Sequence, residues 1–62
     1  MVEVATRHGI VRVKVAYLNG QITNAKPEFD DCASLAAAAS PLVTLGEVQR
    51  AASTAFWAQH DA

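Results

Sequence analysis

Apolar and polar residues alternate along the first part of the chain in the way that half-buried β-strands do. Val2 to Thr6 alternates and breaks at His8–Gly9, where glycine tolerates the positive φ that a tight turn requires. Ile10 to Leu18 alternates again and is rich in β-branched residues. Because side chains on a strand point to opposite faces in turn, we expect one apolar face to meet the helices. Its members are Val11, Val13, Val15 and Tyr17.

A turn signal and a proline bound a third strand. Asn19–Gly20 is the strongest two-residue hairpin signal, because both central positions of a type I′ turn need a positive φ. The third strand is therefore predicted from Gln21 to about Lys26. Pro27 lacks the N–H that a strand ladder uses, yet it suits the first turn of a helix.

From Pro27 onward the apolar spacing is helical. A first helix is predicted from about Pro27 to Ala39, where Ser40–Pro41 breaks it. Its carboxylates Glu28, Asp30 and Asp31 would lie in the first turn, where the helix dipole favours negative charge. The predicted buried stripe is Phe29, Cys32, Leu35, Ala36 and Ala39.

A capping pattern starts a second helix. Thr44 and Glu47 have the Ser/Thr-x-x-Glu spacing in which each side chain satisfies the other residue's free backbone N–H. The helix is predicted to run to Gln59 or His60, with Trp57 off its buried face as a candidate contact with another chain. The predicted stripe is Leu45, Val48, Ala52, Ala55 and Phe56.

These elements predict one small α+β domain over residues 1–62. It consists of a three-stranded antiparallel β-meander followed by two α-helices packed on one face, although the strand order is open. A domain of this size buries only about 60% of the surface that its unfolded chain exposes. Both sheet edges are also open, so we expect self-association or pairing with more protein.

Composition narrows the function classes. Five basic residues against six acidic ones argue against binding to nucleic acid by bulk charge. Cys32 is the single cysteine, so no internal disulfide forms and a reducing, cytoplasmic location is expected. The sequence has no secretion signal and no apolar run near the roughly 20 residues of a membrane span, so we expect neither secretion nor membrane insertion.

Two charged groups are candidates for chemistry. Arg12 and Lys14 lie on one sheet face about 7 Å apart, so they either bind phosphate or form a solvated polar face. Glu28, Asp30 and Asp31 either give oxygen ligands to a divalent cation or compensate the helix N-terminus.

The other reactive side chains indicate no site. His8 and His60 lack local metal-ligand spacing, and Cys32 falls on an apolar stripe where an inert core thiol is expected. The sequence contains no phosphate loop, no dinucleotide fingerprint and no local sign of a Ser-His-Asp triad. Residue chemistry alone therefore does not define a free-standing enzyme.

A longer pattern consists of Gly9, Val11-Arg12-Val13-Lys14-Val15, Asn24, Pro27-Glu28-Phe29, Asp31-Cys32, Leu45 and Glu47-Val48. This pattern resembles the C-terminal segment of the LarC family of nickel-insertion proteins. Members of this family make the nickel pincer cofactor of lactate racemase. The resemblance implies that the chain corresponds to the C-terminal piece of a larger protein.

By this resemblance the chain contributes to CTP-dependent insertion of nickel into a pyridinium bisthiocarboxylate mononucleotide, with Mg²⁺ or Mn²⁺ accompanying CTP. Arg12 and Lys14 would then lie near nucleotide phosphates, and Glu28 and Asp31 near metal or as structural caps. A missing upstream LarC-like chain or a second copy would complete the site. Whether the chain is an enzyme by itself is left open, and the alternative is a non-catalytic oligomerisation or protein-interaction module.

Overall fold

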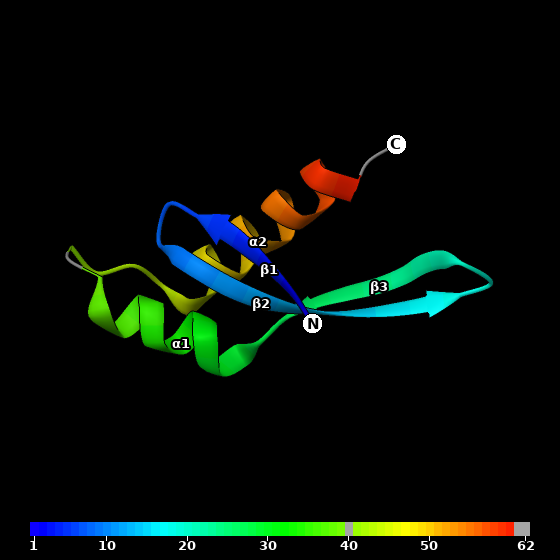
Figure 1. The fold of residues 1–62 in the computed structure, drawn as a ribbon. Helices are drawn as coiled ribbons and strands as arrows, with labels where there is room; N and C mark the ends of the chain where they lie inside the picture. Colours follow the sequence, from blue (N-terminus) through cyan, green and yellow to red (C-terminus); the bar gives the residue numbers. More distant parts are fainter. Residues whose placement is uncertain (40, 61–62) are drawn as a thin grey trace.

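A computed structural model describes residues 1–39 and 41–60 and shows three strands followed by two helices (Figure 1). The strands pair in the order β1-β2-β3 and both pairs are antiparallel. The predicted α+β arrangement is therefore confirmed. The elements are β1 (Val2–Thr6), β2 (Gly9–Leu18), β3 (Gln21–Pro27), α1 (Phe29–Ala38) and α2 (Leu45–His60).

Residues with positive φ close both hairpins, as the sequence predicts. Asn19 has a φ of 53° and Gly20 one of 78°, which is the pattern of a type I′ turn. In the first turn Gly9 has a φ of 136°. There the Thr6 hydroxyl accepts hydrogen bonds from the backbone N–H groups of His8 at 3.0 Å and Gly9 at 3.2 Å.

Strand β3 carries one residue more than the stretch of β2 opposite it. Tyr17 pairs with Ile22 whereas Ala16 pairs with Asn24, which leaves Thr23 without a partner. The Thr23 hydroxyl donates a hydrogen bond to the Ala16 carbonyl at 3.3 Å. Such an extra residue is a β-bulge, and it reverses the alternation of side chains beyond it.

Pro27 is the last residue of β3, so the prediction that it opens the first helix is wrong. The Glu28 N–H donates to the Arg12 carbonyl at 2.8 Å, so the adjacent pair Val13–Pro27 falls at a non-hydrogen-bonded position of the ladder. An N–H at such a position points away from the partner strand, so proline loses no ladder bond there. The helix begins two residues later, at Phe29.

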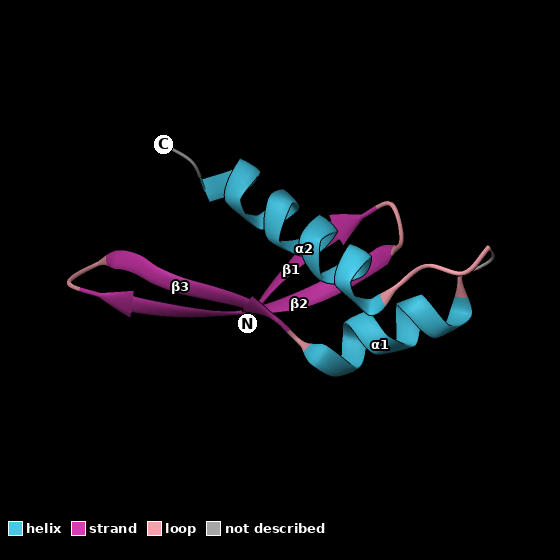
Figure 2. Ribbon diagram, turned by 180° about the vertical axis from the view of Figure 1, so that it is seen from behind, coloured by secondary structure: helices cyan, strands magenta, loops and turns pink. Residues whose placement is uncertain are grey.

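Both helices bury side chains against the valine face of the sheet. Figure 2 shows α2 crossing the sheet and α1 lying beside β2. Cys32 is fully buried, as predicted, and Phe56 is the largest fully buried side chain. The core consists of Val4, Val11, Val13, Cys32, Ala36, Val48, Ala52 and Phe56.

Three residues predicted on buried stripes lie elsewhere. Phe29, the first residue of α1, is 59% exposed. Tyr17 is 62% exposed, because this part of the β2–β3 hairpin extends past both helices (Figure 1). Ala39 lies beyond α1 with an extended backbone, and Ser40 lies outside the described residues.

The start and end of α2 agree with the sequence. The Glu47 N–H donates to the Thr44 hydroxyl at 3.1 Å, which is one half of the predicted reciprocal cap. The helix ends at His60. Val48, Ala52 and Phe56 are buried, and Leu45 and Ala55 pack partly buried against them.

The molecule is elongated, with extents of 42 × 20 × 15 Å. The outer part of the β2–β3 hairpin, residues 16–24, extends along the long axis of the molecule (Figures 1 and 2). We name this part the hairpin arm. Neither α1 nor α2 has the length and hydropathy that a bilayer crossing requires.

Candidate functional site at the strand-to-helix junction

The Asp31 carboxylate joins α1 to β2 through three hydrogen bonds from one residue. Arg12 donates from Nε to Asp31 Oδ2 at 2.8 Å and from Nη2 to Oδ1 at 2.7 Å. The backbone N–H of Arg12 also donates to Oδ2, at 2.9 Å. Bidentate pairing of this kind fixes the guanidinium in one plane and is among the stronger polar contacts in proteins.

The path of the chain explains why a carboxylate is needed there. In a continuing ladder the Arg12 N–H would donate to the Glu28 carbonyl. That carbonyl instead accepts the Cys32 N–H at 3.2 Å, because α1 begins here. Asp31 therefore replaces the lost acceptor. We name Arg12, Glu28 and Asp31 the strand-to-helix junction.

The junction shifts the proton affinity of its members. The hydrogen bonds from the Arg12 guanidinium and backbone lower the pKa of Asp31 from its usual 3.8 to about 2. The same contact raises the pKa of Arg12. The Asp31 side chain is 17% exposed and that of Arg12 is 50% exposed, so solvent reaches this ion pair.

Glu28 and Lys14 lie on the same face as Arg12 but outside the ion pair. The backbone hydrogen bond between Glu28 and Arg12 places Glu28 next to Arg12 in the ladder, and Glu28 has no side-chain capping bond to α1. Lys14 is exposed and pairs directly with Lys26 of β3. The structure thus brings Arg12, Glu28 and Asp31 together and places Lys14 two residues along the strand.

The acids of the junction do not form a ready metal cage. Within residues 1–39 and 41–60, no three His, Cys, Asp or Glu side chains lie close enough to hold a metal ion. Both oxygens of Asp31 already accept hydrogen bonds from Arg12, whereas the Glu28 carboxylate has no such partner among the described hydrogen bonds. Mg²⁺ commonly takes one or two protein carboxylates plus phosphate oxygens and water, so Glu28 is the junction acid that could serve as such a ligand.

The remaining reactive groups lie elsewhere. Burial raises the pKa of the Cys32 thiol, with a smaller contribution from the charge of Asp31, which keeps the thiol protonated. The His60 ring stacks on Phe56 at 4.1 Å between centroids, and its Nδ1 lies 2.8 Å from the Phe56 carbonyl oxygen. His60 thus lies against the end of α2, away from the junction.

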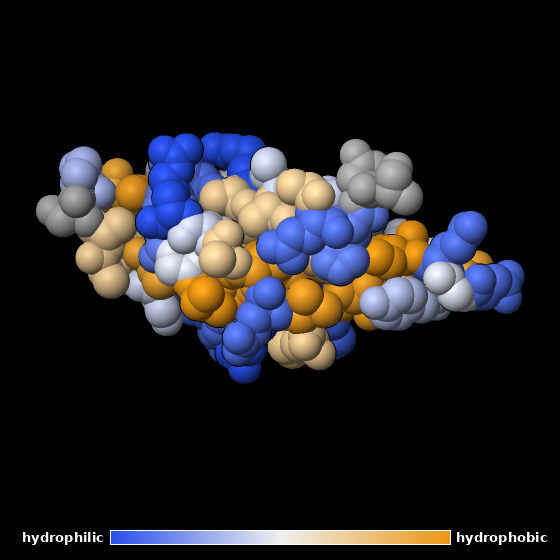
Figure 3. Space-filling model, turned by 45° about the horizontal axis from the view of Figure 1, so that its top comes forward, coloured by the Kyte–Doolittle hydropathy of each residue, from blue (hydrophilic) through white to orange (hydrophobic). Residues whose placement is uncertain are grey.

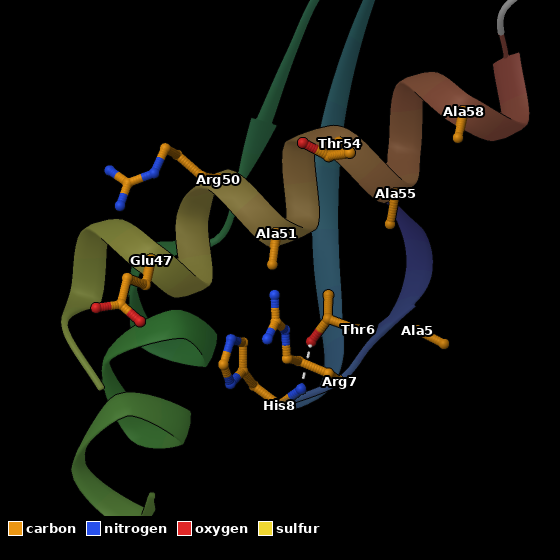
Figure 4. Close-up of a pocket in the computed structure, with 10 residues that line it drawn as sticks. All are labelled: Ala5, Thr6, Arg7, His8, Glu47, Arg50, Ala51, Thr54, Ala55 and Ala58. Atoms are coloured by element: carbon orange, nitrogen blue, oxygen red, sulfur yellow. Dashed lines mark hydrogen bonds between the residues drawn. The ribbon is translucent and has the colours of Figure 1, made fainter. Parts of the chain in front are cut away.

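A separate groove lies between the first hairpin turn and α2. It has a volume of about 670 Å³, and Figure 4 shows Arg7 and His8 projecting from the turn toward Ala51 of the helix. Glu47 flanks it on the helix side. Arg7 is not a candidate from the sequence, because only the hairpin brings it opposite residues some 40 positions later.

Apolar side chains remain exposed beyond the core. Tyr17 and Leu18 are 62% and 64% exposed at the hairpin arm, and Trp57 of α2 is 43% exposed. Figure 3 shows apolar atoms on one face continuing from the middle of the molecule toward the arm. Trp57 lies off the buried stripe, as predicted. Its ring still packs edge-on against the Phe56 ring, with 5.1 Å between the ring centroids.

The fold and the junction define a small α+β module whose charged side chains gather where β3 gives way to α1. Residues 1–48 match the family model described as nickel insertion protein. The chain therefore belongs to the nickel insertion protein family. The matched residues include Arg12, Lys14, Glu28 and Asp31.

A curated relative supports the same family. Over 31 residues the chain is 55% identical to a protein of Cyanothece sp. (strain PCC 7425 / ATCC 29141) that carries the provisional name of nickel insertion protein. The match covers 50% of this chain and 8% of the relative, so the chain corresponds to a small part of that protein. No solved structure matches this chain.

Proposed function

We propose that this chain is a LarC-like module of nickel-pincer cofactor biosynthesis. In this proposal it contributes to CTP- and metal-dependent insertion of nickel into a pyridinium bisthiocarboxylate mononucleotide. Nickel is the cargo of the reaction, and Mg²⁺ or Mn²⁺ accompanies the nucleotide. The single observation that carries the proposal is the family match over residues 1–48, which contains the whole junction.

Lys14 and each residue of the junction have a distinct part in the proposal. Lys14 binds nucleotide phosphate as a flexible point charge, and Glu28 gives a carboxylate oxygen to the accompanying divalent cation. The Arg12 guanidinium is hydrogen-bonded to Asp31, so in this proposal Arg12 holds the junction in place and does not bind phosphate. For Asp31 to become a metal ligand, the cation would have to displace Arg12 from its oxygens.

The module is expected to need more protein to complete the site. Binding pockets for nucleotides enclose most of their ligand. Three grooves in the described part of the chain are lined by residues other than Arg12, Lys14, Glu28 and Asp31. The proposed partner is an upstream LarC-like chain or a second copy, in the cytoplasm. The lone Cys32 supports that compartment.

Titration of the labelled chain with CTP and Mg²⁺ tests the proposal. We expect shifts in the amide signals of Arg12, Lys14 and Glu28. Glu28→Gln should weaken Mg²⁺-dependent binding by about tenfold, the low end of the loss seen when metal-site residues are altered. Glu47→Gln is the matched control, because Glu47 is an exposed acid on α2, at a groove distinct from the junction.

Two results would count against the proposal. One is the lack of any shift at the junction at millimolar CTP and Mg²⁺. The other is equal weakening by Glu28→Gln and Glu47→Gln, which would indicate a general charge effect.

A second candidate function is that of a non-catalytic interaction module. The observation that favours it is the hairpin arm, where Tyr17 and Leu18 remain exposed beyond the helices. β3 is also an edge strand of the sheet and is open to pairing on its outer side. The two functions are compatible, because a second copy could close the nucleotide site.

A further inference from the structure

Two lysines face each other across the hairpin on the sheet face opposite the core. Lys14 of β2 and Lys26 of β3 are direct partners in the antiparallel register. Counting from the hydrogen-bonded pair at Arg12 and Glu28, they occupy another hydrogen-bonded pair, where Cα atoms are about 5.5 Å apart. Both side chains are exposed.

This pairing is unfavourable for the fold by itself. Like charges directly opposite each other on neighbouring strands destabilise a sheet. Neither lysine has a salt-bridge partner in the described part of the chain, where the one salt bridge joins Arg12 to Asp31. A cost to stability at two neighbouring positions suggests a role in binding something negatively charged.

The β-bulge at Thr23 creates the pair. If the register of Leu18–Gln21 and Tyr17–Ile22 continued unbroken, Lys14 would face Ala25. Lys26 would then point to the valine face. The extra residue turns Lys26 to the outer face instead. Bulges often re-aim a side chain next to a functional site.

The backbone around the pair is held firmly. Pro27 fixes its own φ and restricts Lys26 to the extended region. On the other strand, the Arg12–Asp31 contact lies two residues from Lys14. The two ammonium groups therefore start from fixed backbone positions, which lowers the entropy lost on binding.

We infer that Lys14 and Lys26 together bind the phosphate chain of a nucleotide, and that Arg12 is a positioning residue. This inference rests on the proposed function and adds Lys26 to its site. The Arg12 guanidinium is occupied by Asp31, whereas both lysine ammonium groups are available to phosphate oxygens. Glu28, next in the ladder beyond Pro27, lies where a cation bound to those phosphates would need an acid.

Inorganic tripolyphosphate is the probe that tests the lysine pair without the nucleoside. We expect Lys14→Gln and Lys26→Gln each to weaken tripolyphosphate binding about ten- to hundredfold, as the loss of one charge-assisted hydrogen bond would. Arg50→Gln is the matched control, since Arg50 is an exposed cation on α2, and it should change binding less than twofold.

Thermal unfolding separates a binding role from a structural one. Removing one of two facing charges relieves repulsion, so Lys26→Gln should leave the unfolding midpoint unchanged or raise it while binding falls. A lower midpoint together with weaker binding would overturn the inference, because Lys26 would then support the fold. Equal binding by Lys26→Gln and the unsubstituted chain would also overturn it.

Titration with CTP distinguishes failure of this inference from failure of the proposed function. If CTP with Mg²⁺ still shifts Lys14 and Glu28 while Lys26→Gln binds normally, the inference is wrong and the proposed function stands. If tripolyphosphate binds at both lysines but CTP does not bind, the proposed function is wrong and the pair is a general polyphosphate site. If neither ligand binds, both are wrong.

Discussion

Asp31 stabilises the junction because its carboxylate takes the place of a carbonyl that the start of α1 withdraws from β2. Arg12 gives it both side-chain and backbone hydrogen bonds, at 2.7–2.9 Å. One side chain thus ends the strand ladder and fixes the direction of the first helix. Both residues are site candidates from the sequence, but spacing alone could not show that they bind each other.

Acid should weaken the fold through Asp31. Its pKa falls from 3.8 to about 2 on folding, so its contribution to stability is full above about pH 4 and is lost as pH falls toward 2. We expect Asp31→Asn to have a lower unfolding midpoint at pH 7 and a flatter decline between pH 4 and 2. Thermal scans across that pH range measure the unfolding midpoints, with Asp30→Asn as the control. An acid dependence of Asp31→Asn identical to that of the unsubstituted chain would contradict this account.

Lys26 shows where residue-level prediction ends. A two-residue turn at Asn19–Gly20 implies an unbroken register in which Lys14 faces Ala25. The β-bulge at Thr23 shifts that register by one residue. Local propensity does not fix such a bulge, because it depends on how the hairpin twists against the rest of the sheet.

At the scale of elements, alternation, turn signals and capping predict the strands and α2 closely. Asn19–Gly20 and Gly9 have the predicted positive φ values, and Thr44 caps α2. The predicted start of α1 is two residues too early, because Pro27 is compatible both with the end of a strand and with the start of a helix. Only the hydrogen-bond alternation of the ladder decides between them.

Gly9 should be sensitive to any side chain. Its φ is 136°, and a Cβ there would lie 2.8 Å from Leu35 Cδ2 of α1. We expect Gly9→Ala to lower the free energy of unfolding by about 1–3 kcal/mol, through backbone strain and displacement of Leu35. Urea unfolding measures the change.

Gly20→Ala is the matched control for Gly9. Gly20 also has a positive φ, but a Cβ added there would meet no atom within 4 Å, so only backbone strain applies. Gly20→Ala should therefore lower the free energy of unfolding by less than Gly9→Ala does. Equal losses at the two glycines would show that contact with Leu35 contributes nothing.

At the scale of the whole molecule, the core is small and the hairpin arm has no cover. Within residues 1–39 and 41–60, eight side chains form the buried core, and Phe56 is the one aromatic ring among them. The chain length predicts incomplete burial, and the three-stranded meander predicts open sheet edges. The sequence does not predict the arm, because strand lengths do not show which part of a hairpin the helices cover.

The arm should mediate self-association if the interaction function holds. Light scattering over a range of concentrations should show a rising mean mass, and Tyr17→Ser should weaken association by about tenfold, as truncation of a buried aromatic anchor does. Leu42→Ser is the control, since Leu42 is 91% exposed but lies in the loop before α2. A monomer at every concentration would contradict this function.

The most direct test of the proposed site is to locate a nucleotide-bound metal ion on the protein. Mn²⁺ broadens the amide signals of nearby residues, so the labelled chain with CTP and Mn²⁺ reports the site itself. We predict broadening around Lys14, Lys26 and Glu28 that requires CTP. Broadening confined to the groove of Arg7, His8 and Glu47, or unchanged signals throughout, would contradict it.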